Sequence, residues 1–228
     1  SEVMKLERLG CFHHSRLSFM RQLLRRINKE KWIFSPSEIN INSKKEGLVV
    51  KKVFTNKRYY SLVCFIHNIS NTDRSDRVIA EKWDLTFTLY DGVPNKEAIN
   101  RLSENVPKQE DSRMTSSELV LGRANKSLRV WEKIIEVLSK GNQPSKMLIE
   151  DVGYLMRTTA VYGSGKFGLA DREMIEDRIE FQSPFQAEML AVYLLRSVVF
   201  DLVDYFANIR GGNNAITLNL NFRRKIGI

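Results

Sequence analysis

The spacing of hydrophobic residues changes its period twice along this chain, and this change constrains the fold more than any single motif does. Apolar side chains repeat at helical spacing within 14–30. Two runs, 47–54 and 59–67, are then rich in β-branched and aromatic residues, and 77–92 alternates between apolar and polar side chains. From residue 95 onward the period is helical again. Strands grouped together and followed by helices predict an α+β fold rather than alternating βαβ units.

The first predicted helix, 14–30, has an apolar stripe and a basic outer side. Its stripe consists of Leu17, Met20, Leu23, Leu24 and Ile27. Its opposite face carries His14, Ser18, Arg21 and Arg25. We expect such an amphipathic helix to bury the stripe and to leave the basic side in solvent.

The middle of the chain predicts a small antiparallel sheet of about three strands. Residues 55–58 are a plausible turn, so 47–54 and 59–67 are expected to form a hairpin. In the third strand, one side carries Ile79, Trp83, Leu85, Phe87 and Leu89, and the other carries Lys82, Asp84, Thr86 and Thr88. This alternation indicates a sheet with one buried and one solvent-exposed face.

The remainder of the chain is predicted to be mainly helical. The expected helices are 96–104, 115–139, 147–160, 169–178 and 183–210, the last capped by Ser183 with Pro184 at its first position. Residues 216–222 alternate weakly and are interpreted as a returning strand or an extended tail. We divide the chain into a helix-and-sheet region, 1–106, a possible linker, 107–114, and a helical region, 115–228. Two alternatives stay open: one continuous domain, and a chain that is a piece of a longer protein.

The positive charge is concentrated at the N-terminus. Residues 1–60 contain 14 lysines and arginines but only 5 aspartates and glutamates, which accounts for the whole net charge of +9. Residues 61–228 contain 22 of each kind. This asymmetry favours an anionic partner such as nucleic acid, an acidic surface or a phosphorylated ligand, although a solvated basic surface without a partner would look the same.

Several classes of protein are not indicated. A hydrophobic content of 43% is typical of a soluble globular protein. The most apolar run, 187–203, contains three charged residues, so we expect no membrane span. Cys11 and Cys64 lack the spacing of a disulfide framework or a zinc site, and the three histidines form no ligand cluster. We therefore predict no metal site and a reducing compartment, the cytoplasm.

The stretch VYGSGKFG, 161–168, suggests a phosphate-binding loop. Phe167 follows Lys166 where a nucleotide-binding loop has Ser or Thr, and the preceding segment reads as a helix instead of a strand. Our first hypothesis is therefore a small anionic or phosphorylated ligand bound near 157–172, with a structural turn as the alternative. The predicted ligand-binding residues are Arg157, Tyr162, Ser164, Lys166 and Arg172, with Glu188 as a candidate acid or base.

Two other functions remain open. A module that binds nucleic acid or an acidic partner would use Arg21, Arg25, Lys57, Arg58 and Tyr60, because basic residues interleaved with aromatic ones suit single strands. A structural or interaction domain without catalytic activity is the third reading. Three charges, Arg123, Glu188 and Arg196, fall on apolar helix faces and are expected to pair internally or to line a cleft. The sequence assigns no reaction, cofactor or oligomeric state.

Overall fold

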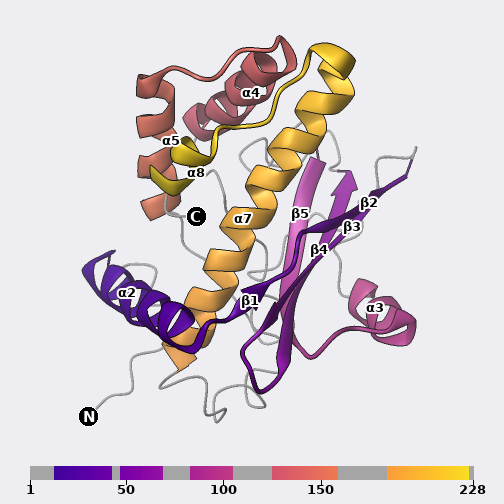
Figure 1. The fold of residues 1–228 in the computed structure, drawn as a ribbon. Coiled ribbons are helices and arrows are strands. Elements are labelled where there is room, and N and C mark those ends of the chain that lie inside the picture. The colour runs from indigo at the N-terminus through magenta and orange to yellow at the C-terminus, as the bar shows by residue number, and fades with distance from the viewer. Residues whose placement is uncertain (1–12, 43–46, 69–82, 105–124, 159–183, 226–228) are drawn as a thin grey trace.

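The computed structural model describes residues 13–42, 47–68, 83–104, 125–158 and 184–225 (Figure 1). The described elements are α2 (His13–Glu30), β1 (Ile33–Phe34), β2 (Glu38–Ile41), β3 (Gly47–Phe54), β4 (Tyr59–Asn68), β5 (Trp83–Asp91), α3 (Lys96–Ser103), α4 (Asn125–Ser139), α5 (Lys146–Thr158), α7 (Pro184–Gly211), the 3-10 turn η2 (Gly212–Asn214) and α8 (Leu220–Lys225). This order of helix, sheet and helices confirms the predicted α+β fold.

The antiparallel sheet is larger than the predicted three strands. Its order is β1-β3-β4-β5, and β2 also pairs with β3, which makes five strands. β1 and β2 lie one after the other along the same edge of β3, opposite Phe54–Val53 and Val50–Gly47 respectively. They contain only two and four residues, which is too short to show a period in the sequence.

The predicted hairpin between β3 and β4 is confirmed. The backbone N–H of Thr55 donates to the carbonyl of Arg58 at 3.0 Å and closes the turn. Asn56 takes a left-handed conformation, φ 71°, which asparagine tolerates better than most residues. The two strands then pair in register from Phe54–Tyr59 to Gly47–Ile66.

The expected solvent-exposed face of the sheet is covered over part of its area, so that prediction was wrong there. Thr88 lies on this outer face and is fully buried. Helix α3, which begins after the N-cap Asn95, packs there, and its Leu102 joins Val63 and Phe65 in a second hydrophobic cluster. The polar character of alternate residues in 77–92 indicated a wet face, but it could not show that a later helix folds back over it.

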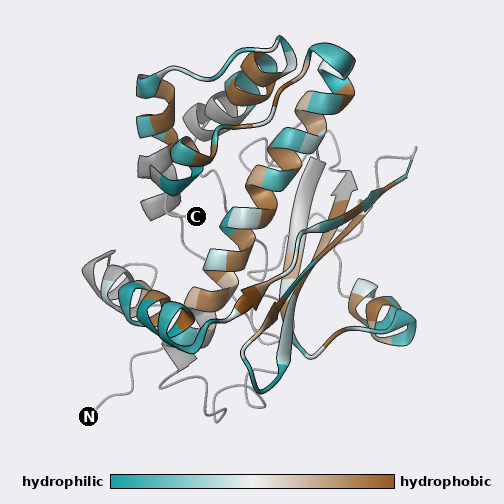
Figure 2. Cartoon of the chain, viewed as in Figure 1, coloured by the Kyte–Doolittle hydropathy of each residue, from teal (hydrophilic) through white to brown (hydrophobic). Residues whose placement is uncertain are grey.

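The inner face of the sheet packs on α7, which runs diagonally across it (Figure 1). One hydrophobic core contains buried side chains from α2, the sheet, α4, α5 and α7, from Met20 to Leu218. Among the largest fully buried side chains are Tyr60, Phe87, Phe200 and Phe206. Helix α2 lies at the edge of this core and buries only one of its sides. Figure 2 shows both hydrophobic and hydrophilic residues along the described part of this helix.

The other predicted helices are confirmed where the structure describes them. Helix α7 begins at Pro184 as expected, and the predicted helix 115–139 is described from Asn125 onward. Residues 216–222 are no returning strand: the chain has no regular secondary structure up to Asn219 and then forms the short helix α8. The possible linker 107–114 and the predicted helix 169–178 lie outside the described residues. In the described part of the chain, no helix is long and apolar enough to cross a membrane.

Candidate functional site

Most of the predicted small-anion site lies outside the described residues. This applies to Tyr162, Ser164, Lys166 and Arg172 and also to the inward charge Arg123. The backbones of Arg157, near the end of α5, and Glu188, in α7, are described, but their side chains are not. The small-anion hypothesis therefore stays a prediction.

The nucleic-acid hypothesis, in contrast, falls largely on described residues. Arg21, Arg25 and Lys29 are spaced four residues apart on α2, and all three are exposed. This spacing places them in one row along the helix. The stripe on the other side is buried at Met20, Leu23 and Ile27, so the predicted orientation of this helix is confirmed.

The end of α2 is shaped by a tight cap that turns the chain into β1. Lys31 has a left-handed conformation, φ 55°, and the N–H of Trp32 donates to the carbonyl of Ile27 at 3.1 Å. This 6→1 bond is that of a Schellman motif, with the buried Trp32 and Ile27 supplying its hydrophobic contact. The cap leaves Lys31 exposed beside the last turn of the helix.

A second contact brings the β3–β4 turn to the same place. The side-chain amide of Asn56 donates through Nδ2 to the backbone carbonyl of Glu30. This bond satisfies one of the carbonyls that a helix leaves unpaired at its C-terminus. Lys57 is exposed in that turn, and its charge is close enough to act on Glu30. Residues far apart in the sequence therefore meet at one corner of the molecule.

We call the exposed cations at this corner and along α2 the basic surface. It consists of Arg21, Arg25, Lys29, Lys31 and Lys57. Within the described part of the chain, none of these five forms an ion pair with a carboxylate, and only Lys57 lies close enough to act on one, Glu30. The neighbouring Arg58 is only partly exposed.

A hydrogen-bonded group beneath the basic surface fixes α2 in place. Arg26 donates to the Glu30 carboxylate at 3.1 Å and to the buried side chain of Gln186 on α7 at 3.3 Å. Trp32 donates through Nε1 to Glu30 at 2.7 Å. Burial raises the pKa of Glu30, but the bonds from Trp32 and Arg26 outweigh it, and the net pKa is lowered. The lowered pKa keeps Glu30 ionised beside Arg26, which links α2 to α7, while Arg21, Arg25 and Lys29 remain on the solvent side.

The tyrosine chosen from the sequence is not the accessible one. Tyr60 is completely buried, whereas Tyr59 is 43% exposed. The alternation of β4 contains a signal that could have shown this, because Leu62, Cys64 and Ile66 share the parity of Tyr60 and all face the core. Burial also raises the pKa of the Cys64 thiol, which keeps it in the neutral, unreactive form.

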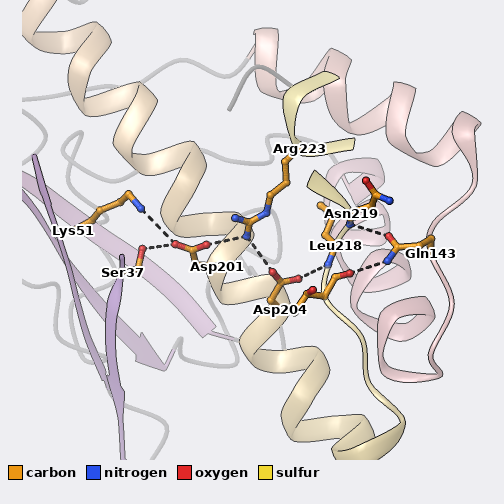
Figure 3. Close-up of polar contacts among 9 residues, drawn as sticks. Ser37, Lys51, Gln143, Asp201, Asp204, Leu218, Asn219 and Arg223 are labelled. Carbon is orange, nitrogen blue, oxygen red and sulfur yellow. Dashed lines mark hydrogen bonds and ion pairs between the residues drawn. The ribbon is translucent and has the colours of Figure 1, made fainter. Parts of the chain in front are cut away.

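A separate cluster of charges lies between the sheet, α7 and the C-terminal segment (Figure 3). Lys51 of β3 lies 3.7 Å from Asp201 Oδ2, and Ser37 donates to the same oxygen. Arg223 of α8 donates to Asp201 Oδ1 at 2.9 Å and to Asp204 Oδ2 at 3.1 Å. Two cations thus meet two carboxylates, and the cluster has no net charge with which to attract an ion.

The same cluster ties the C-terminal segment to the helices. Asp204 accepts the backbone N–H of Leu218 at 2.8 Å. Gln143 accepts from the N–H of Asn219 at 3.0 Å and donates to the carbonyl of Thr217 at 2.8 Å (Figure 3). These bonds replace the strand ladder that the sequence suggested for this segment. We interpret the charge cluster as structural.

Ionisation within the charge cluster reflects its burial. Burial lowers the pKa of Lys51; Asp201 opposes this effect and Arg223 adds to it. Burial raises the pKa of Asp204, and the Leu218 N–H and Arg223 offset this only in part. No spacing in the sequence pointed to Arg223 as the partner of Asp201 and Asp204.

Comparison with protein-family models, curated proteins and solved structures finds no match for the chain. In the part that the structure describes, no group of three or more His, Cys, Asp or Glu side chains is placed to hold a metal ion.

Proposed function

We propose that this protein binds nucleic acid through its basic surface. The observation that supports the proposal most directly is the hydrogen bond from Asn56 to the carbonyl of Glu30, which joins the β3–β4 turn to the end of α2. Because of this contact, five cations from two separate segments of the chain lie on one surface. Lysine and arginine contacts to phosphates, with release of bound counterions, supply most of the affinity in such complexes.

The extent of the basic surface favours a polymer over a single phosphate group. Arg21 and Lys29 are eight residues apart on α2, which corresponds to about 12 Å along the helix axis at a rise of about 1.5 Å per residue. Lys31 and Lys57 continue the surface past the helix end. A row of cations on this scale matches successive phosphates along a strand better than one small anion.

The buried free thiol of Cys64 agrees with a reducing compartment, and we propose the cytoplasm.

The test is a binding titration of the whole protein with fluorescently labelled single-stranded and duplex DNA, followed by anisotropy. We expect the affinity to fall steeply as salt rises from about 50 to about 200 mM. The double variant Arg21→Glu with Arg25→Glu should lose more than about tenfold in affinity, and the slope of log affinity against log salt should decrease by about 2.

A matched control makes the same charge change elsewhere. Lys133→Glu with Lys146→Glu alters two exposed lysines of α4 and α5, away from α2 (Figure 1). These changes should leave the salt slope as it is. Binding that does not depend on salt, or an equal loss in both double variants, would contradict the proposal. If the wild type bound polyglutamate but no DNA, an acidic protein partner would replace nucleic acid.

A further inference from the structure

An exposed apolar row crosses the outer face of the sheet next to the β3–β4 turn. Phe54 pairs with Ile33 on one side and with Tyr59 on the other, so the three side chains lie on the same face of the sheet. Ile33 is 60% exposed and Tyr59 43% exposed, while Phe54 is half-buried between them. We call these three residues the apolar row.

Part of the described outer face away from the apolar row is covered by α3. Helix α3 packs over the strands around Val63 and Phe65, and Tyr90 packs against the same cluster. Between that cluster and the apolar row lies Lys52, which is paired with Glu38 at 3.5 Å. The apolar row is therefore open to solvent at the end of the sheet where α3 does not reach.

The aromatic rings of the apolar row support one another. The Phe54 and Tyr59 ring centroids are 4.8 Å apart with an angle of 36° between the planes. This packing restricts the Tyr59 ring while leaving part of it accessible. The row spans three strands, or about 10 Å at a strand spacing of about 4.8 Å. That width suits one or two unpaired bases and is too small for the side of a duplex.

The apolar row and the basic surface adjoin each other. Lys57 lies in the four-residue turn that connects Phe54 with Tyr59, and Lys31 precedes Ile33 by two residues. Exposed rings beside exposed cations are what proteins use to bind single-stranded nucleic acid, because bases stack on the rings while the phosphates meet the charges. A duplex would keep its bases stacked inside, so its phosphates would contact the cations but no base would reach the rings.

From this juxtaposition we infer that the partner is single-stranded nucleic acid and that an unpaired base stacks on Tyr59. The inference rests on the nucleic-acid binding proposed above and specifies its substrate class. Stacking on an aromatic side chain is tolerant of sequence, so the site would accept different bases. Tyr59 is then a binding residue in addition to the cations.

The experiment uses the whole protein with a labelled thymidine oligonucleotide of about 12 nucleotides, and a duplex of equal length. Tyr59→Ala should weaken single-strand binding by between about 5-fold and about 150-fold and leave the salt slope unchanged. Tyr59→Phe, which keeps the ring, should retain binding, whereas Tyr59→Leu, which keeps only the apolar character, should not. Met147→Ala, at another exposed apolar residue, is the control and should have no effect.

The results separate this inference from the proposed function. If Tyr59→Ala bound the oligonucleotide normally while the Arg21 and Arg25 reversals abolished binding, stacking would be refuted and polyanion binding would stand. If Tyr59→Ala weakened single strand and duplex equally, the single-strand assignment would be overturned. A wild type that bound neither DNA would refute both. Light scattering that showed a dimer dissociated by Tyr59→Ala, with oligonucleotide binding unaffected, would instead identify the row as an interface between two copies.

Discussion

Arg223 connects the C-terminal segment to α7 through two carboxylates. Its guanidinium bonds to Asp201 and Asp204 together, and it also lies over the Phe200 ring at 5.9 Å. The three charged side chains are only 16–23% exposed. Removing Arg223 from this group is costly, because Asp204 then loses its ion-pair partner in a poorly solvated place and Asp201 keeps only Lys51.

We predict that Arg223→Met destabilises the protein by about 2–4 kcal/mol at pH 7, slightly less than the loss of a fully buried ion pair. Methionine keeps most of the apolar stem, so the loss reports mainly on charge. Arg224→Met, at the exposed neighbour, should cost less than about 0.5 kcal/mol. Urea unfolding of both variants measures the difference.

The same variant has a pH dependence with a definite sign. Burial raises the pKa of Asp204 in the folded state, so ionised Asp204 disfavours folding above that pKa and stops doing so once it is protonated. Without Arg223 the folded-state pKa should rise further. The destabilisation by Arg223→Met should therefore shrink as the pH falls from 7 towards about 4, where the carboxylates take up protons. An equal loss at both pH values would argue that packing, and not charge, is responsible.

At the level of elements, the sequence predicted the helices and strands whose hydrophobic residues repeat at a regular spacing, and it missed the elements without such a repeat. The stripe of α2 recurs through Met20, Leu23 and Ile27, and its burial follows from helical geometry alone. β1 and β2 are too short to carry a period, and α8 is held by Arg223 rather than by a pattern of its own. The cations of the basic surface were visible in the sequence, but the Asn56–Glu30 contact that unites them is tertiary.

The junction of α7 with α4 offers a prediction about two neighbouring glycines. A Cβ on Gly211 would lie 2.1 Å from the carbonyl oxygen of Ser139 at the end of α4, although the backbone of Gly211 is in the ordinary helical region. Gly212 has φ +54° but open space around it. The first glycine is thus required by close packing, and the second by backbone conformation.

We predict that Gly211→Ala destabilises by about 3 kcal/mol, near the upper end for overpacking, because a backbone carbonyl cannot move aside as a side chain can. Gly212→Ala should cost about 1 kcal/mol, the penalty of a left-handed conformation for alanine. For a chain of this size, the melting temperature should fall by roughly 6–12 °C and roughly 2–4 °C respectively. Thermal unfolding by circular dichroism gives both values, and the reverse order would contradict the close approach of α7 to α4.

At the scale of the whole molecule, the buried side chains of the sheet and of the later helices belong to one core. Leu62 and Phe87 of the sheet, Ile135 of α4 and Leu202 of α7 are all members of it, and α7 contacts α2, α4 and the sheet. Residues 1–106 without α7 would expose the inner face of the sheet. Monomeric proteins in water rarely expose an apolar surface as large as a sheet face.

We therefore predict that the chain unfolds in one cooperative step. Tryptophan fluorescence and far-ultraviolet circular dichroism should show the same urea midpoint, because the sheet cannot keep its structure once α7 has left it. A fragment of residues 1–106 expressed alone should lack a cooperative transition, and adding a fragment of 115–228 should restore one if the two associate through the shared core. Two separate midpoints in the whole chain, or a fragment 1–106 that melts cooperatively by itself, would show instead that the sheet region is a domain in its own right.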